Sequence, residues 1–509
     1  MTRAVDAVVI GSGPNGLVAA NVLADRGWDV HVLEAQPKPG GAVRSVSREP
    51  GVTWDLFSSF YPFALVAPAM PQLGLERFGL HWSHAESPVA QVIGPGSDDV
   101  VRIERTPRQT AESLARFSAK DASTWLSLCE EWQSVKAPLL SILFSPFPPA
   151  RGAVSLLHRF GVADGMRLAR FLALPVQRME RELFESRAAR LLLRGNALHA
   201  DVPVTAPVSG MVGYVLTMLA QESGFPTPRG GAQQLTSALT RRLEAGGGYI
   251  TCNARVQRIL VQGGRATGVV TDTDETVYAR RAIIADVSAP DLYESLLPRS
   301  VVPERVRQGI EKFQWDPPVV KSNYVIEGEI PWASPLAASA GTVHIGGGDD
   351  QDRLILFGQM TAADSTRSPA GLTSAWAYTK APRGSTELEH REIAAAMTEK
   401  IDTYAPGFAE RIVDVEVQTG SQLERDNENL RGGAVNSGTF ELFQQYVFRP
   451  FPGLADNHTP VKGLYLGSAS AHPGGGVHGM CGWNAAHSAL KARGPRQRLR
   501  AAIARKLMQ

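Results

Sequence analysis

The sequence predicts an α/β protein that begins with a strand–helix–strand unit. Three observations support this: a short apolar run at residues 7–10 before a glycine turn, a helical pattern at 17–24 that stops at Gly27, and a second apolar run at 30–33. Two parallel strands need a crossover connection between them, so the three segments form one βαβ unit. The length of 509 residues fits about three domains or a two-domain enzyme with interleaved segments, and length alone does not choose between them.

Composition narrows the class of protein. The 509 residues are 43% hydrophobic and 20% charged, which excludes disordered, collagen-like and coiled-coil proteins. A formal net charge of +2 provides no global field that would recruit nucleic acid, so no nucleic-acid partner is expected. Cys129, Cys252 and Cys481 form no CxxC pair, which argues against a disulfide framework and favours a reducing cytoplasm. No export signal is visible, and no run of 18 apolar residues predicts a spanning helix.

The segment after the first unit is mostly helical, from residue 116 to 198. Between Lys136 and Arg178 it carries six basic residues and one acid, Asp164. A basic amphipathic stretch of this kind can lie on a membrane surface or cover an apolar pocket. The alternative is a solvated helix face over an ordinary core.

Alternating strand and helix patterns return after residue 228. The predicted elements are a helix at 235–243, strands around Val256, Ile259 and Val269, a buried strand at 282–285, a mixed-sheet region at 304–451, a strand at 463–467 and a small-residue helix at 482–492. The last 19 residues carry seven basic and no acidic side chains. They predict a solvated or frayed helical tail.

The first glycine turn has the pattern of a Rossmann-like dinucleotide site. It reads Gly11-Ser12-Gly13-Pro14-Asn15-Gly16, between a strand and a helix. Gly11 permits the tight turn, Gly13 lets a pyrophosphate approach, and the helix N-terminus offers free N–H groups to phosphate. Glu34, with Ala35 behind it, ends the second strand, where a carboxylate can accept hydrogen bonds from a ribose diol. A plain glycine turn with a solvated Glu34 is the alternative.

A second glycine pair follows at Gly40 and Gly41, with Arg44 three residues later. This pattern resembles the flavin oxidoreductases that have an extended second glycine motif, in which the backbone and the arginine approach the pyrophosphate of FAD. A guanidinium suits that position because it neutralises phosphate charge. A surface turn with a salt-bridging Arg44 is the alternative.

The C-terminal segment contributes to a resemblance that covers nearly the whole chain. Its glycine-rich run from residue 463 to 486, together with Pro228-Arg229-Gly230-Gly231, resembles the phytoene desaturase-like branch of the FAD amine-oxidase superfamily, which includes pyridine-nucleotide-disulfide-oxidoreductase-domain-like proteins. The resemblance is strongest at residues 5–45, 226–290 and 430–490. It implies an FAD-binding domain built from residues 1–75, 226–300 and 455–509, and a mixed α+β substrate domain built from 76–225 and 301–454, with 136–198 as its helical region.

The same resemblance implies individual contacts with the cofactor. Gly467, Ser468, Gly476, Val477 and His478 are implied near the flavin, and the backbone of Val256 near the adenine. His472 and His478 are the candidates for general acid and base. A structural hydrogen bond is the more frequent role of such histidines.

The sequence gives fewer candidates for the substrate pocket than for the cofactor site. Phe60 and Tyr61 belong to an aromatic run at 54–63 that the family position brings toward the flavin, with core packing as the alternative. His199 and Arg449 are further candidates for the pocket wall. Asp349, Asp350 and Asp352 follow three glycines and are expected to form a solvated acidic turn, so no metal site is predicted.

Together these observations predict an FAD-dependent oxidoreductase. The resemblance implies hydride transfer between flavin and a lipophilic polyprenyl or unsaturated lipid, by desaturation, saturation or isomerisation. An amine oxidase is one alternative, and an FAD-binding regulatory protein without turnover is another. A nicotinamide dehydrogenase leaves the motifs at 40–44, 228–231 and 467–482 unexplained. Peripheral membrane contact is a separate hypothesis, and a homodimer is compatible with the sequence.

Overall fold

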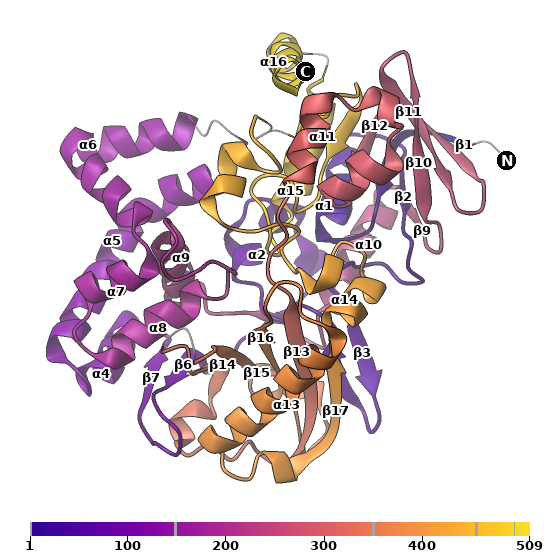
Figure 1. Ribbon diagram of the computed structural model, residues 1–509. Coiled ribbons are helices and arrows are strands. Elements are labelled where there is room, and N and C mark those ends of the chain that lie inside the picture. Colours follow the sequence, from indigo (N-terminus) through magenta and orange to yellow (C-terminus); the bar gives the residue numbers. More distant parts are fainter. Residues whose placement is uncertain (1–2, 147–149, 349–351, 454–456, 493, 509) are drawn as a thin grey trace.

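The computed structural model describes residues 3–146, 150–348, 352–453, 457–492 and 494–508. Two seven-stranded sheets and a group of helices make up the molecule. In Figure 1 the first sheet lies at the upper right, the second below it, and the helical region at the left. The predicted α/β class is confirmed.

The first sheet carries the predicted βαβ unit. Its order is β10-β11-β12-β1-β2-β9, and β18 pairs with β12. The strands β12, β1, β2, β9 and β18 run parallel, and β10 and β11 are antiparallel. The bounds are β1 (Arg3–Ile10), β2 (Val30–Leu33), β9 (Tyr249–Thr251), β10 (Val256–Gln262), β11 (Arg265–Thr271), β12 (Thr276–Ala285) and β18 (Leu464–Leu466).

Helices cover both faces of this sheet because its central strands are apolar on both sides. Ala7 and Val9 face one core cluster, and Val8 and Ile10 face another. Helices of the first face are α1 (Pro14–Ala24), α10 (Gln233–Ala245) and α15 (Met480–Leu490). The second face carries η2 (Asp291–Leu296), α11 (Glu304–Glu311) and α16 (Pro495–Met508).

The second sheet is mostly antiparallel and has the order β17-β13-β16-β15-β14-β6-β7. Only β14 and β6 pair in parallel among its described strands. The bounds are β6 (Ser87–Val92), β7 (Val100–Ile103), β13 (Val319–Glu327), β14 (Ala340–Ile345), β15 (Ile355–Gln359), β16 (Leu372–Lys380) and β17 (Ile412–Gln418). The strands thus come from 87–103 and 319–418, whereas those of the first sheet come from 3–33, 249–285 and 464–466. The domain boundaries themselves stay a prediction.

The predicted helical region packs beside the second sheet. Its helices are α4 (Pro107–Ala115), α5 (Ala119–Phe144), α6 (Ala150–Ala173), α7 (Val176–Leu183), α8 (Arg187–Ala197) and α9 (Ser209–Ser223). Helix α6 bends at Gly161, which has a positive φ, and exposes Val162 and Met166 beyond the bend. Within the described ranges, no helix is both long and apolar enough to cross a bilayer.

Short elements connect these layers: β3 (Ser45–Arg48), β4 (Val52–Asp55), α2 (Pro62–Val66), α3 (Ala69–Leu73), β5 (Trp82–Ser83), β8 (Thr227–Pro228), α12 (Met360–Ala363), α13 (Glu387–Tyr404) and α14 (Gly420–Asp426). The C-terminal tail differs from the prediction. Instead of a frayed segment, α16 packs Ala504 and Met508 into the core below the first sheet.

Candidate active site

One large cavity runs between the two sheets. Its volume is about 930 Å³, and it is lined by the glycine turn after β1, the ends of β2 and β12, the segment 57–63, helix α9, and strands β13 and β16. Twelve of the predicted cofactor residues lie on its wall: Gly11, Ser12, Gly13, Pro14, Asn15, Glu34, Ala35, Gly41, Val256, Ser468, Gly476 and Val477. The structure therefore brings together three segments far apart in sequence, and their contacts with FAD stay predictions.

The glycine turn has no room for side chains. A Cβ on Gly16 would lie 2.3 Å from the carbonyl oxygen of Gly11, and a Cβ on Gly41 would lie 2.8 Å from the Cα of Gly13. Gly11 has a φ of +91°, which favours glycine. The bare backbone and the N-terminus of α1 form a cradle that fits the pyrophosphate of a dinucleotide.

Glu34 lies where the ribose is expected. Its carboxylate accepts hydrogen bonds from the backbone N–H of Ser12, at 2.9 Å, from the Ser12 hydroxyl, and from the N–H of Gln36, at 2.8 Å. These bonds hold the carboxylate at the end of β2 while it still lines the cavity. The residues present fit FAD.

Replacing Glu34 by alanine is expected to weaken FAD binding by roughly tenfold to a hundredfold, because charge-assisted hydrogen bonds of this kind contribute about 1.5–3 kcal/mol. Titration of the apoprotein, followed by flavin fluorescence, measures the Kd. Glu76→Ala, which removes an exposed carboxylate, is the control. An unchanged Kd for Glu34→Ala would show that the buried carboxylate of Glu34 holds the glycine turn and does not contact FAD.

Asp286 is a cofactor-side residue that the sequence reasoning missed. Its carboxyl oxygen accepts the N–H of Gly16 at 2.8 Å, and it lines the cavity. Burial raises the pKa of Asp286 well above its usual range, and the nearby Glu34 raises it further. The position of Asp286 directly after the buried strand 282–285 was the available signal.

Five predicted cofactor residues do not line the cavity: Gly16, Gly40, Arg44, Gly467 and His478. Arg44 lies behind the second glycine turn, where its guanidinium donates to the carbonyl oxygens of Gly41, at 3.1 Å, and Asp426. Its guanidinium also lies 5.3 Å from the ring of Phe57. In this structure Arg44 therefore fixes the loop that carries Gly41.

The predicted acid–base role of His472 and His478 needs correction. Both are buried, and neither lines the cavity. The ring of His472 bonds to the carbonyl oxygen of Ser145 at 2.9 Å, and Nδ1 of His478 accepts the N–H of Met480 at 3.0 Å. Burial lowers the pKa of each to about 4. Both histidines are neutral hydrogen-bonding groups: His472 ties the glycine loop to the end of helix α5, and His478 ties it to the start of helix α15.

Arg449 also differs from the prediction. It is fully buried away from the cavity, and its guanidinium donates to backbone carbonyl oxygens of residues 436, 437, 438, 439 and 469. A guanidinium with five donors can satisfy such a cluster, which a shorter side chain cannot. Arg449 therefore joins two loops, and does not form a pocket wall.

The other predicted substrate residues do line the cavity. Phe60 lies 6.0 Å from the ring of Trp376, and the hydroxyl of Tyr61 donates to the carbonyl oxygen of Ser58 at 2.7 Å. His199 shares a 2.9 Å hydrogen bond with the ring of His344, and burial lowers the pKa of His199 to about 3. All three groups are neutral wall residues.

The part of the cavity away from the glycine turn is called here the chamber. Its wall consists mainly of apolar side chains from the segment 57–63, helices α5 and α9, and the second sheet: Phe60, Phe63, Leu143, Met211, Val212, Val215, Leu216, Phe225, Trp376 and Tyr378. The acids that line the cavity, Glu34, Asp286, Asp291, Asp426 and Glu428, all lie on the cofactor side. No Asp or Glu among the described residues lines the chamber.

Lys321 is the charged group of the chamber, and the sequence reasoning missed it as well. It lies on β13 and is buried, and its Nζ donates to the carbonyl oxygens of Asp55 and, at 3.1 Å, Phe57. Burial lowers the pKa of Lys321 to about 7, Asp55 opposes this shift, and Arg367 adds to it. The signal was a lysine inside an otherwise buried strand.

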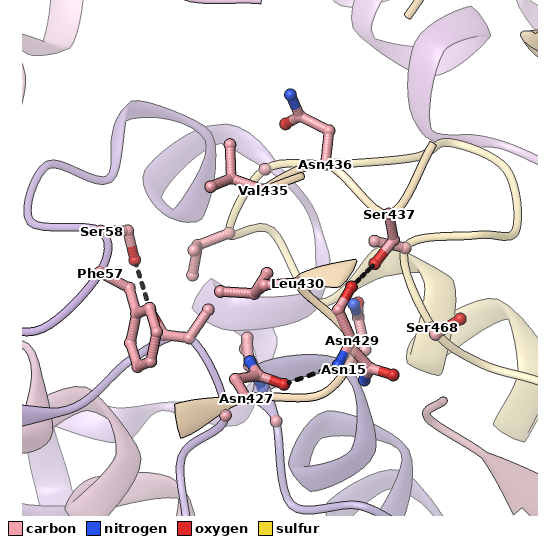
Figure 2. A pocket seen from close by; sticks show the side chains of 18 of the residues that line it. Asn15, Phe57, Ser58, Asn427, Asn429, Leu430, Val435, Asn436, Ser437 and Ser468 are labelled. Atoms are coloured by element: carbon pink, nitrogen blue, oxygen red, sulfur yellow. Dashed lines mark hydrogen bonds between the residues drawn. The ribbon is translucent and has the colours of Figure 1, made fainter. Parts of the chain in front are cut away.

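A loop after α14 closes the cavity from the side opposite Phe57 and Ser58, as Figure 2 shows. Asn429 donates its N–H to the side chain of Asn427 at 3.2 Å, and its own carbonyl oxygen accepts the Ser437 hydroxyl at 3.3 Å. These bonds order the loop, which lines the same cavity as Asn15.

No metal site is present among the described residues. Asp349 and Asp350 lie outside the described ranges, and the carboxylate of Asp352 contacts the amine of Lys400 at 2.5 Å.

Comparisons with known proteins give the family of this chain. The family model described as "Flavin containing amine oxidoreductase" matches residues 15–486. The chain is 27% identical to the rat (Rattus norvegicus) pyridine nucleotide-disulfide oxidoreductase domain-containing protein 2, over 95% of this chain and 92% of that protein. It is 24% identical to the zeta-carotene-forming phytoene desaturase of Myxococcus xanthus, over 92% and 90%.

Among solved structures, cyclohexylamine oxidase from Brevibacterium oxydans has the same fold, with a TM-score of 0.60 and 17% identity over 99% of this chain and all of that one. The relatives confirm the predicted resemblance to phytoene desaturase-like proteins, and the family confirms the predicted cofactor. The chain belongs to the flavin-containing amine oxidoreductase family and is an FAD-dependent oxidoreductase.

Proposed function

We propose that this enzyme forms or reduces a carbon–carbon double bond in a lipophilic, polyprenyl-like substrate. The observation that carries the proposal is the chamber: it opens onto the cofactor side of the cavity, its wall is mainly apolar, and no described carboxylate lines it. A hydrocarbon chain gains free energy on entering such a space, at roughly 25 cal/mol per Å² of buried apolar surface.

The lack of a carboxylate in the chamber also argues against an amine as the substrate. A protonated amine entering the chamber would meet Lys321 and no described acid that could balance its charge. An uncompensated buried cation is strongly unfavourable. The phytoene desaturase of Myxococcus xanthus, to which this chain is similar along most of its length, is named for an unsaturated hydrocarbon. Both points support the lipophilic substrate.

The chemistry divides between cofactor and protein. Forming a double bond between two adjacent carbons removes one hydride and one proton, and reducing it adds both. Bound FAD supplies the hydride acceptor or donor. The chamber excludes water and orients the chain, and Lys321 takes or gives the proton. A neutral lysine has two N–H donors, which the carbonyls of Asp55 and Phe57 occupy, so that its lone pair is left as the proton acceptor.

The direct test is anaerobic mixing of the purified holoenzyme with candidate substrates while the flavin absorbance is recorded. Polyprenyl alkenes in detergent micelles are expected to bleach the oxidised flavin, or polyenes to reoxidise the reduced flavin, whereas putrescine and cyclohexylamine change neither. Bleaching by an amine alone would favour an amine oxidase. A flavin that responds to no alkene and no amine would favour a binding protein without turnover.

The shape of the chamber gives a second prediction. Val212 is a half-buried residue of α9 that lines the chamber, and Val212→Trp places an indole in that space. The value of kcat/KM for the longest accepted substrate is expected to fall roughly tenfold or more, with less change for a shorter one, because overpacking costs about 1–3 kcal/mol. Val162→Trp, at a residue on α6 that is 72% exposed, is the matched control. Equal losses for both variants would contradict the assignment of the chamber.

A further inference from the structure

One wall of the chamber is a face of the second sheet. Strands β13 and β16 are antiparallel neighbours, and Lys321 of β13 lies directly opposite Tyr378 of β16. Directly opposite residues point to the same face of a sheet, with Cβ atoms about 4.5–5.5 Å apart. Both side chains line the cavity. The proposed proton-transfer group and a phenol hydroxyl therefore lie side by side in the chamber wall.

Neighbouring side chains hold the ring of Tyr378 in place. It stacks on Trp376, with ring centres 5.7 Å apart and ring planes 24° apart. Trp376 is held in turn, because its indole N–H donates to Sδ of Met360 at 3.0 Å. Tyr378 also packs against an apolar cluster that contains Val319 and Leu423. The ring is thus supported by apolar contacts, and the hydroxyl is the part of the side chain that can bind a polar ligand.

The hydroxyl of Tyr378 has no hydrogen-bond partner among the described residues. Two polar groups on the same face of the sheet do have partners: Lys321 donates to two backbone carbonyl oxygens, and His344 shares a 2.9 Å hydrogen bond with His199. Burial, together with the charge of Asp201, raises the pKa of Tyr378. The hydroxyl therefore keeps its proton and is a hydrogen-bond donor that lacks an acceptor.

A pure hydrocarbon in the chamber would leave this donor unpaired, which is unfavourable in a space that excludes water. Thr342, which lines the chamber from β14, is a second residue whose buried hydroxyl lacks a partner among the described residues. No described Asp or Glu lines the chamber to accept these bonds. An uncharged oxygen on the substrate supplies an acceptor without burying a further charge.

We propose that the reacting double bond of the substrate is conjugated to a carbonyl group, and that Tyr378 binds the carbonyl oxygen. This assignment rests on the function proposed above and specifies its substrate as a lipophilic enone or the corresponding saturated ketone. The observation that carries it is the pairing of Tyr378 with Lys321 across two adjacent strands. In an enone, the carbon that takes the proton is bonded to the carbonyl carbon, so the two groups of the protein are needed next to each other.

The reduction balances with the groups of this site. A hydride from reduced FAD adds to the β carbon, the electrons of the carbon–carbon π bond shift to the carbonyl oxygen, and FAD is left oxidised. Tyr378 donates a hydrogen bond to that oxygen and keeps its proton. The ammonium form of Lys321 then gives a proton to the α carbon, and the carbonyl double bond forms again. Formation of the carbon–carbon double bond is the reverse of these steps.

The test uses an α,β-unsaturated ketone with a polyprenyl tail and the matching diene, in which a methylene group replaces the carbonyl oxygen. Each is mixed anaerobically with holoenzyme that stoichiometric dithionite has reduced, and reoxidation of the flavin is followed by absorbance. The wild-type enzyme is expected to react faster with the ketone than with the diene. Tyr378→Phe is expected to slow the reaction with the ketone by about 10²–10³-fold, because it removes a donor to the developing oxyanion.

A second measurement does not depend on turnover. Oxidised holoenzyme has no hydride to give, so it binds the ketone without reducing it. The Kd of the ketone, from the change in flavin absorbance, is expected to increase roughly tenfold in Tyr378→Phe. Infrared difference spectra with an isotope-labelled carbonyl are expected to show a lower C=O stretching frequency in wild type than in Tyr378→Phe, because a hydrogen bond weakens the C=O bond.

Tyr324 is the matched control for Tyr378. It is a buried tyrosine of the same sheet, but it lies on the face opposite to Lys321, where its ring packs with Phe408 and its hydroxyl bonds to Thr398 at 2.9 Å. Tyr324→Phe is expected to keep the wild-type rate, Kd and carbonyl frequency. Flavin content and the thermal midpoint confirm that both variants are folded.

The outcomes distinguish this inference from the function on which it rests. If neither the ketone nor the diene binds or reoxidises the flavin, both fail. Reoxidation by the diene as fast as by the ketone, or equal ketone rates and carbonyl frequencies in wild type and Tyr378→Phe, would overturn the inference alone. If Tyr378→Phe does not fold, the wild-type complex decides: a carbonyl frequency equal to that of the free ketone in hexane would overturn it.

Discussion

Replacing Lys321 by methionine is expected to lower kcat by about 10²–10⁴-fold while FAD stays bound. The reason is that Lys321, the charged group of the chamber, is buried with a pKa near 7, where a group can both take and give a proton at physiological pH. Methionine fills a similar volume without a titratable nitrogen. Steady-state turnover of the best alkene or polyene substrate, with flavin content measured in parallel, gives the result.

The pH profile separates this role from a merely structural one. In the desaturating direction the neutral amine is required, so turnover by the wild type is expected to rise with pH through about 7, and in the reducing direction it is expected to fall. The pH profile of Lys321→Met is expected to lack this change in turnover near pH 7. Lys321→Arg keeps a cation that does not deprotonate, and it is expected to be inactive in the desaturating direction. A wild-type kcat and inflection in Lys321→Met would exclude the assignment.

The pH dependence of folding stability gives an independent measure of the shifted pKa of Lys321. The pKa of Lys321 falls from 10.5 to about 7 on folding, so the unfolded chain binds more protons between these values. The contribution of Lys321 to stability therefore increases as pH rises from about 7 to 10.5. Lys321→Met is expected to remove this contribution to the slope, as measured by chemical denaturation at several pH values.

Replacing Arg367 by methionine is expected to destabilise the protein by about 3–5 kcal/mol, because it leaves a buried carboxylate without its partner. Arg367 and Asp55 are both buried, and their side chains lie 3.0 Å apart. Arg367 also contacts Asp364 at 3.2 Å and donates to the Thr227 hydroxyl at 2.8 Å. The thermal midpoint and the denaturation midpoint measure the loss.

The control for this variant is Arg108→Met, at a side chain that is 89% exposed, for which a change within about 0.5 kcal/mol is expected. A second readout connects Arg367 to the chamber. The charge of Arg367 lowers the pKa of Lys321, and Asp55 raises it. If Arg367→Met remains folded, the inflection in its pH profile is expected to move to higher pH. A stability equal to that of the control would contradict the account of the buried pair.

Several features could be predicted from the sequence because they depend on local spacing. The strand before Gly11, the helix after it and Glu34 at the end of the second strand are set by residues within about thirty positions of one another. The backbone cradle needs glycine for steric reasons, and the structure has no space for a Cβ at Gly16 or Gly41. FAD as the cofactor followed from these motifs and from the family resemblance.

Side-chain direction could not be predicted in the same way. His472 and His478 occur in the correct glycine-rich segment, yet both rings bond to backbone groups away from the cavity. Arg449 turns inward to satisfy carbonyl oxygens of two loops. A motif predicts the position of the backbone. Where a polar side chain points depends on which backbone groups of neighbouring loops still need a hydrogen-bond partner.

The sequence by itself determined the α/β class and the dinucleotide motif, since both rest on short-range backbone geometry, and its resemblance to a flavin family gave the cofactor. Only the tertiary structure decided the chamber, because its wall comes from the segment 57–63, helices α5 and α9 and strands β13 and β16. It also decided the roles of Lys321 and Asp286. Strand β13 is buried along nearly all its length, so alternation cannot indicate which side chains face the cavity. Burial and the groups around each side chain set its pKa, and both arise only when distant segments pack together.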